Sequence, residues 1–420
     1  MSSGRAFVHP GDDMAKRLMI LMLGALVAGT DARAQSAQSA GEALRTVLFR
    51  GEDSSATGAL SENSSAALYG LLLGETTTFP IGSSAGGFTW TFDSNLRVPI
   101  RRSSSFGSMF AERPFTTGRG KLNLGAAFQH TRFTSVGGQP LTNLESSISY
   151  RFGNEIYRLA SSVQVEIDRT VLSATYGIHD RVDVGVIVPV GRAHVSGFSS
   201  NYQLYQGIVD TKRTDASGSS FGTGDMVVRT KAALIATNRF DAAAAVDVRL
   251  PTGDPDKLLG TGHTQAKVLF IGGSTVGSVT PHVNVGYTLG GSGMTFGADN
   301  RWSGSFGDPE LIRRQPSDEF NYTVGADVAA TPRITIAGDV IGRVVKNTAE
   351  MRLFDNGPSV PDRQIFLEVV PGTVHLLLGA VGAKVSIGGS WLATGTILVP
   401  VNDHGIKPAV TPVIGFERAF

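Results

Sequence analysis

Acidic and basic residues stand two or four positions apart in several segments that alternate apolar with polar residues. Asp225, Arg229 and Lys231 follow this spacing, and Asp247 and Arg249 repeat it further on. Because side chains two residues apart lie on the same face of a β-strand, these charges are expected on one side of a sheet. There they can pair and hold the strands in register, or restrict a passage and select what enters it. We call the charged positions of these strands the inward phase, because in a barrel they would face the inside. The candidates on it are Asp183, Asp225, Arg229, Lys231, Asp247, Arg249, Asp327, Asp339 and Arg343, and His282, Asn284 and Lys267 share it.

The positions between the charges are mostly apolar. In 181–190 every even position is valine, whereas the odd positions include Arg181 and Asp183. Segments 225–234, 240–250 and 320–329 alternate in the same way. Period two with one apolar face predicts half-buried strands. In a soluble sandwich the apolar face would point to the core, whereas in a membrane barrel it would meet lipid and the charges would line the lumen.

Strand lengths and connections favour the membrane barrel. The predicted strands span ten or more residues, and short polar turns alternate strictly with long loops at 195–223, 251–263, 290–319 and 344–374. This rhythm is typical of bacterial outer-membrane barrels. The strands are predicted at 119–133, 163–178, 181–194, 224–236, 239–250, 264–275, 279–289, 320–330, 332–343, 375–386, 389–399 and 408–420. A hairpin at 86–93 and 96–102 would bring twelve strands to fourteen. The fold class is all-β, a transmembrane antiparallel up-and-down barrel of 12–14 strands.

A secretion signal precedes the strands. Lys16 and Arg17 stand before the apolar run 18–28, and an A-x-A site follows that predicts cleavage after Ala34. Met14 is the expected start, so residues 1–34 are assigned to the signal peptide. Eleven apolar residues are too few to span a bilayer, which takes about 20, and no other stretch is a candidate transmembrane helix. We expect the outer membrane of a Gram-negative bacterium, with outer-membrane lipid and the barrel-assembly machinery as partners and Phe420 as the assembly signal.

Residues 35–85 differ from the remainder of the chain. Segments 41–50 and 64–74 carry apolar stripes that predict two short helices, separated by a Ser/Gly-rich stretch. This N-terminal segment either lies in the periplasm or folds back as a plug in the lumen. The barrel is expected to occupy 86–420.

Composition argues against several other functions. The net charge is +1 without a long basic run, so no nucleic-acid partner is predicted, and the absence of Cys removes disulfides and thiolate chemistry. Gly82 to Gly86 matches G-x-S-x-G, but a strand rather than a helix is expected to follow it. The histidines are scattered singly, and Asp254 with Asp256 is too small a set for a calcium site. No enzymatic activity, metal or cofactor is predicted.

Several segments resemble one outer-membrane transporter family. They are 82–92, 105–121, 222–231, 250–254 and 407–420, and the likeness extends over about residues 82–420. The family is the one named after the meta-pathway of phenol degradation, which is similar to the fatty-acid transporter superfamily. The resemblance implies passive passage of small hydrophobic or aromatic molecules.

Two functions fit these expectations. The first is a channel for passive uptake of small hydrophobic or aromatic compounds, for which Ile187, Val227, Leu269 and Ile341 interrupt the inward charges and offer an apolar path. The second is a barrel with a closed lumen that acts through its long outer loops in a structural, adhesin or receptor role. Closed barrels also pack apolar groups inside, so these four residues do not separate the two.

Overall fold

The computed structural model describes residues 38–49, 62–82, 87–93, 98–101, 105–150, 155–237, 240–297, 310–355, 357 and 364–420. The predicted signal peptide with Ala34, and Ser83 to Gly86 of the G-x-S-x-G match, lie outside these residues. No described helix is long and apolar enough to cross a membrane.

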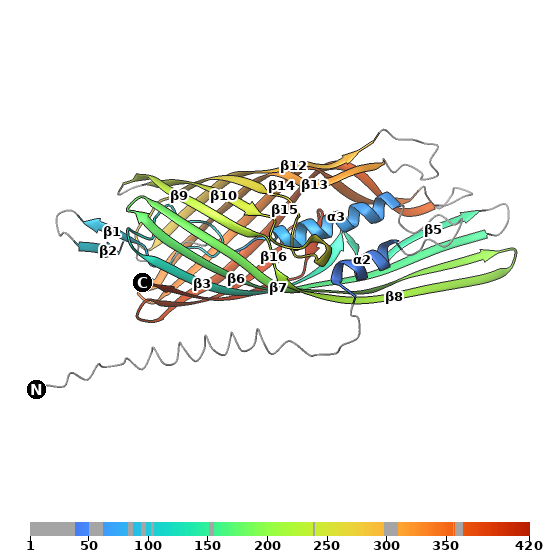
Figure 1. Ribbon diagram of the computed structural model, residues 1–420, viewed down its shortest axis with the longest axis horizontal. Coiled ribbons are helices and arrows are strands. Elements are labelled where there is room, and N and C mark those ends of the chain that lie inside the picture. Colours follow the sequence, from blue (N-terminus) through green and yellow to red (C-terminus); the bar gives the residue numbers. More distant parts are fainter. Residues whose placement is uncertain are drawn as a thin grey trace, which may run out of the picture.

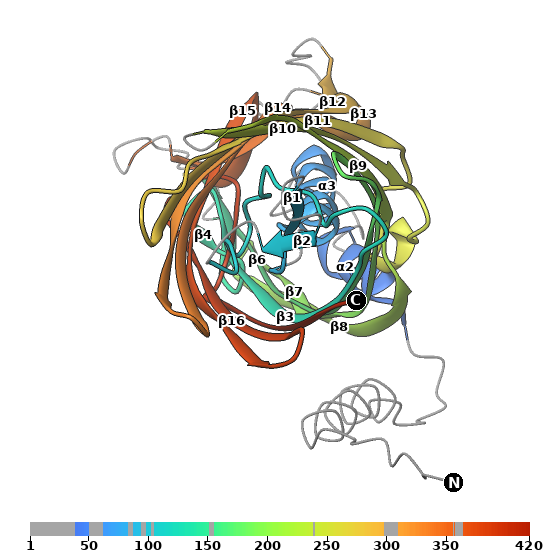
Figure 2. The same cartoon turned by 90° about the vertical axis from the view of Figure 1, so that its left-hand side faces the viewer.

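Twelve antiparallel strands among the described residues form a closed ring, which confirms the predicted fold (Figure 2). Strand β18 pairs with β3 and closes it. The ring strands are β3 (Leu122–Val136), β6 (Glu155–His179), β7 (Val182–Tyr205), β9 (Met226–Ala236), β10 (Asp241–Leu250), β11 (Gln265–Gly273), β12 (Val279–Phe296), β13 (Leu311–Thr331), β14 (Ile334–Asp355), β15 (Gln364–Gly388), β16 (Trp391–Pro400) and β18 (Thr411–Ala419). The predicted N-terminal hairpin exists as β1 (Trp90–Asp93) and β2 (Val98–Arg101), but these strands pair with each other outside the ring. The barrel therefore has twelve strands rather than fourteen.

Several strands continue far beyond the predicted ends. Strand β8 (Ile208–Thr223) pairs with the second half of β7, and β5 (Leu144–Tyr150) pairs with the first part of β6. Strands β14 and β15 also remain paired up to Asp355 and Ile365. Much of the predicted loops 195–223, 290–319 and 344–374 is thus strand, and that part of the prediction was wrong. Beyond the lipid both faces of a strand meet water. The alternation of apolar and polar residues therefore disappears there, while the hydrogen bonding between neighbouring strands continues.

The two ends of the barrel differ as the turn lengths predict. Tight turns connect β6 to β7, β13 to β14 and β15 to β16, and they lie at the same end as the C-terminus (Figure 1). Gly389 has a φ of +56° in the last of these turns, a conformation that glycine adopts without strain. Longer connections stand at the other end and include η1 (Pro255–Lys257), β4 (Gln139–Pro140) and β17 (Ile406–Pro408). We assign the tight-turn end to the periplasm, because bacterial barrels have short periplasmic turns.

The outer face of the ring is apolar and uncovered. Phe270, Val324 and Val381 are 61%, 50% and 57% exposed, while the charges on the alternate positions are buried inside. A continuous apolar belt of this kind is stable against lipid and not against water. Near the C-terminus, the guanidinium of Arg418 lies over the rings of Trp391 and Phe420, at 4.9 and 4.6 Å from their centroids.

Two helices lie inside the ring, α2 (Ala40–Phe49) and α3 (Glu62–Thr78) (Figures 1 and 2). They match the predicted helices at 41–50 and 64–74, although α3 is longer at both ends. Helix α2 begins with a capping box: Glu42 N donates to Ser39 Oγ (3.1 Å) and Ser39 N donates to Glu42 Oε2 (2.8 Å). This box satisfies two backbone donors at the start of a short helix.

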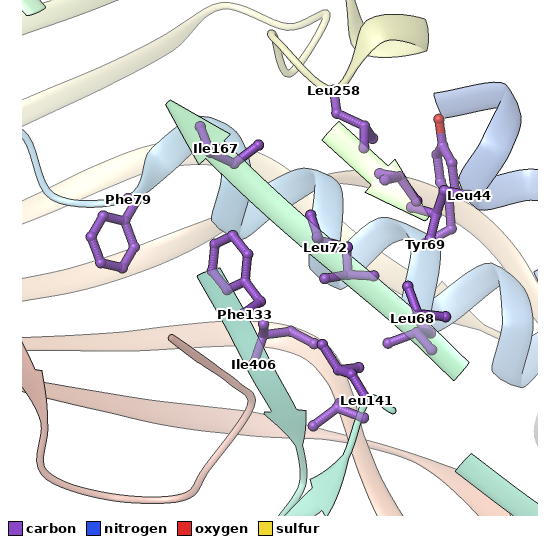
Figure 3. Packing of buried hydrophobic residues seen from close by; sticks show 14 of the residues in the cluster. Leu44, Leu68, Tyr69, Leu72, Phe79, Phe133, Leu141, Ile167, Leu258 and Ile406 are labelled. Carbon is purple, nitrogen blue, oxygen red and sulfur yellow. The ribbon is translucent and has the colours of Figure 1, made fainter. Parts of the chain in front are cut away.

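A hydrophobic cluster holds the helices against the inner wall. Leu44 of α2 and Leu68 and Leu72 of α3 are fully buried with Phe133 of β3 and Ile167 of β6 (Figure 3). Each buried leucine contributes roughly 1.5–3 kcal/mol relative to exposure. Phe79, just after α3, meets Phe133 edge to face, with ring centroids 6.2 Å apart. Much of the half of the lumen near the long loops is therefore filled by the chain itself.

Candidate functional site in the barrel lumen

Residues 105–117, here called the luminal segment, bind three of the predicted inward carboxylates. Ser105 Oγ donates to Asp327, and the backbone amides of Met109 and Phe110 donate to Asp339 Oδ2 at 3.2 and 3.0 Å. The amide and hydroxyl of Thr117 donate to Asp183 Oδ2 at 2.9 and 3.3 Å. The three carboxylates thus act as acceptors that fix this segment to β7, β13 and β14.

A glycine allows two of the buried side chains on the wall to meet. Gly325 on β13 stands in register with His282 on one side and Asp339 on the other. His282 reaches across it, and its Nε2 lies 2.6 Å from Asp339 Oδ1. A Cβ at position 325 would lie 2.3 Å from the carbonyl oxygen of Gly338, 2.5 Å from Asp339 Oδ1 and 2.8 Å from His282 Nε2, so only glycine fits here.

Arg229 joins the wall to the luminal segment. Its Nε and Nη2 donate to the two oxygens of Asp247, each at 2.6 Å, and its Nη1 donates to Glu112 of the luminal segment. Lys231 lies beside this group, with its Nζ 3.7 Å from Asp183 and 3.3 Å from the carbonyl oxygen of Arg113. Register explains the pairing, because Asp247 is directly opposite Arg229 and Asp183 is directly opposite Lys231.

Arg343 joins the wall to helix α3 in the same way as Arg229 joins it to the luminal segment. Its Nε and Nη2 donate to Glu319 of β13 at 3.1 and 2.8 Å, and its Nη1 donates to both oxygens of Glu75 at 3.1 and 3.0 Å. Nη2 also donates to Thr78 Oγ1 at 2.8 Å. One arginine therefore binds one carboxylate of the wall and one of α3.

Two further arginines of the wall meet the carboxyl end of α3. Arg249 Nη1 donates to the carbonyl oxygen of Thr77 at 3.1 Å, and Arg169 of β6 donates to that of Thr76. The last carbonyls of a helix have no intrahelical partner and carry partial negative charge, so these cations stabilise the helix end. Arg169 was not among the predicted candidates.

Asp225, also among the candidates, binds a loop at the outer end. It lies just before β9 and accepts from Gly253 N at 3.0 Å and from the amide and hydroxyl of Thr261, each at 2.8 Å. Nearby, Arg45 of α2 donates to Asp256 at 2.5 Å, and this hydrogen bond raises the pKa of Arg45. Within the described part of the chain, no three His, Asp or Glu side chains gather so as to hold a metal ion.

A cavity of about 170 Å³ lies between the wall and the N-terminal residues. The four apolar residues of the inward phase all line it. The apolar lining comprises Ile187, Val227, Leu269 and Ile341 from the strands together with Phe79, Pro80, Ile81 and Phe110. The charged lining comprises Arg229, Asp247, Arg249, Lys267, Glu319, Arg343 and Glu112. The arrangement offers a single small compound both an apolar surface and polar groups.

Sequence reasoning missed the two glutamates that complete the arginine clusters. Glu75 lies near the end of α3, and Glu112 lies in the luminal segment, which has no strand or helix pattern. Alternation identifies the inward face of a strand, but it carries no information on which non-strand residue will meet that face.

The molecule thus belongs to a definite class of membrane protein. A closed barrel with an apolar outer face, paired charges inside, and tight turns at one end is an outer-membrane β-barrel of a Gram-negative bacterium. Residues 146–349 match the model of the family described as the MetA-pathway of phenol degradation. The family resemblance predicted from the sequence is confirmed.

Solved structures give further similarities, whereas no curated protein matches the chain. An outer membrane channel from Pseudomonas putida F1 is 11% identical, with a TM-score of 0.43, and the match covers 72% of this chain and 96% of that one. A FadL homologue of Pseudomonas aeruginosa is 10% identical, with a TM-score of 0.32 and coverage of 72% and 90%. The monoaromatic hydrocarbon channel CymD is 9% identical, with a TM-score of 0.35 and coverage of 72% and 89%.

Proposed function

We propose that this barrel is an outer-membrane channel through which small hydrophobic or aromatic compounds pass passively, without cofactor or energy coupling. The observation that carries the proposal is the cavity inside the lumen, with apolar strand residues on one side and Phe79 and Phe110 on the other. Its volume of about 170 Å³ is close to the roughly 150 Å³ of an apolar protein cavity that takes up benzene. A compound with one aromatic ring therefore fits it.

The N-terminal residues act in this proposal as a plug. Helices α2 and α3 pack against the inner wall, and the luminal segment binds Asp183, Asp327 and Asp339. The inward charges then serve mainly to fix the plug and brace the strands. Passage requires the plug to move, while the cavity supplies an intermediate binding position along the path.

The experiment compares cavity-filling variants with their lipid-facing neighbours. Ile341 lines the cavity and is 7% exposed, whereas the adjacent Val340 is 44% exposed on the outer face. A deletion strain complemented with Ile341→Trp should take up toluene or phenol more slowly than one with the parent chain. The Val340→Trp strain should match the parent, provided that both variants reach the outer membrane folded.

The second candidate function is a surface role for a barrel with a closed lumen. It is favoured by the hairpin of β7 and β8, which extends from the ring at the long-loop end (Figure 1). Under this alternative, neither deletion of the gene nor Ile341→Trp changes uptake of any compound in a broad panel. Shortening the hairpin would then abolish the surface role, whether structural, adhesin or receptor, while uptake stayed constant.

A further inference from the structure

We infer that the cavity contains a subsite for the anionic head of an aromatic carboxylate, with Lys267 and Arg249 as the binding cations. This inference rests on the proposed channel function and narrows its substrate class. The family resemblance implies hydrophobic or aromatic compounds in general. The arrangement of charge in the cavity favours those that carry a negative group at one end of the ring.

Two of the four cations that line the cavity are already neutralised by carboxylates. Arg229 binds Asp247 through two hydrogen bonds and also binds Glu112. Arg343 binds Glu319 and Glu75. These guanidiniums have little capacity left for a further anion.

Lys267 and Arg249 differ from them, since neither forms an ion pair with any carboxylate that the structure describes. Lys267 stands opposite Asp247 in the register of β10 and β11, but both oxygens of Asp247 accept hydrogen bonds from Arg229 at 2.6 Å. Arg249 gives one of its five N–H donors to Thr77. Two cations at the same cavity, on neighbouring strands, thus retain the capacity to bind an anion.

A neutral donor lies next to these cations. Thr288 of β12 is in register with Lys267, and its hydroxyl donates to Asn321 Oδ1 at 3.2 Å. The other atom of that amide, Asn321 Nδ2, is buried and has no hydrogen-bond partner among the described residues. Asn321 also lines the cavity. A carboxylate supplies the acceptors that the ammonium, the guanidinium and this amide lack.

The remainder of the cavity suits a ring. Val227, Leu269 and Phe110 line the same space as the two cations. The volume of about 170 Å³ admits one aromatic ring with a small substituent, judged against the roughly 150 Å³ that takes up benzene. Benzoate is therefore the simplest probe, and benzamide is its neutral counterpart of almost the same shape.

The test measures binding of both probes to the purified, folded protein by calorimetry or saturation-transfer NMR. The parent should bind benzoate at least tenfold more tightly than benzamide. Lys267→Met should lose about tenfold or more in benzoate affinity and leave benzamide binding unchanged, and Arg249→Gln should act in the same direction. Lys346→Met is the matched control, because Lys346 lies near Tyr287 and does not line the cavity.

The outcomes separate this inference from the channel function. Equal affinities for benzoate and benzamide, or a benzoate affinity that Lys267→Met leaves unchanged, would overturn the anionic subsite while the channel proposal stands. If neither compound binds and neither enters vesicles that contain the protein, the channel proposal fails, and the subsite with it.

Discussion

Replacing Glu75 with Gln should loosen helix α3 in the lumen by about 2–3 kcal/mol. Arg343 Nη1 binds both oxygens of Glu75 at 3.1 and 3.0 Å, and the side chains are only 9% and 12% exposed. The amide of Gln removes the charge from this contact, although one weaker hydrogen bond can re-form. The substitution therefore removes charge-assisted hydrogen bonds at a site that is largely shielded from water.

The size of the effect depends on what Arg343 retains. Removing the sole partner of a buried charge costs about 3–5 kcal/mol. Here Arg343 keeps Glu319, at 3.1 and 2.8 Å, so the penalty should stay below that range. Since 1.4 kcal/mol is a factor of ten, about 2–3 kcal/mol raises the population of the undocked helix roughly 30- to 140-fold.

The chain has no cysteine, so one introduced thiol reports this opening. Ala67 of α3 is fully buried, and in an Ala67→Cys background the rate of thiol labelling by a small reagent measures how often α3 leaves the wall. Adding Glu75→Gln should accelerate labelling roughly 30- to 140-fold. The control Glu350→Gln removes an exposed partner of Arg352 and should change the rate less than about twofold. An acceleration under threefold for Glu75→Gln would refute the reasoning.

Three other substitutions test the plug and the wall. Gly325→Ala should clash with the carbonyl oxygen of Gly338, break the hydrogen bond of Asp339 to the histidine across β13 and destabilise the barrel by about 2 kcal/mol or more. Gly338→Ala is the control, because its new Cβ has its nearest neighbour at 3.8 Å, and it should be nearly neutral in thermal unfolding. Leu72→Ala should weaken docking of α3 by about 2–5 kcal/mol, and a labelling rate equal to the parent's would contradict its place in the core. Ser39→Ala should cost about 1 kcal/mol in the stability of α2, and unchanged hydrogen exchange in that helix would argue against the capping box.

The sequence predicted the ring because lipid imposes a chemical difference between the two faces of each strand. The valines at even positions of 182–190 and the charges at Asp247 and Arg249 report that difference directly. Where a strand leaves the membrane the difference ends, and β8 begins with six residues, 208–213, that are all exposed. No periodic signal is left there, so this strand could be found only from its pairing with β7.

The site was predictable only in part, for a related reason. Alternation assigned Arg229 and Arg343 to the inward face, but their second carboxylates come from residues outside the strands, Glu112 and Glu75. Asp225 has the same phase as the other candidates, yet its partners lie in the loop after β10. Phase along a strand gives the direction of a side chain, whereas its partner depends on tertiary contacts between distant segments.

The two arginine clusters share a design that bears on how the lumen opens. Arg229 takes one carboxylate from the wall, Asp247, and one from the luminal segment. Arg343 likewise takes Glu319 from the wall and one carboxylate from α3. If the N-terminal residues move away, Arg229 and Arg343 each keep their wall partner, so neither of these two arginines is left unpaired, whereas Arg249 and Arg169 lose the carbonyl oxygens of Thr77 and Thr76. At Arg229 and Arg343 the movement therefore avoids the largest electrostatic penalty, that of a buried charge without a partner. The resistance that remains comes mainly from the hydrophobic cluster around Leu68 and Leu72, and Leu72→Ala should consequently ease opening more than Glu75→Gln does.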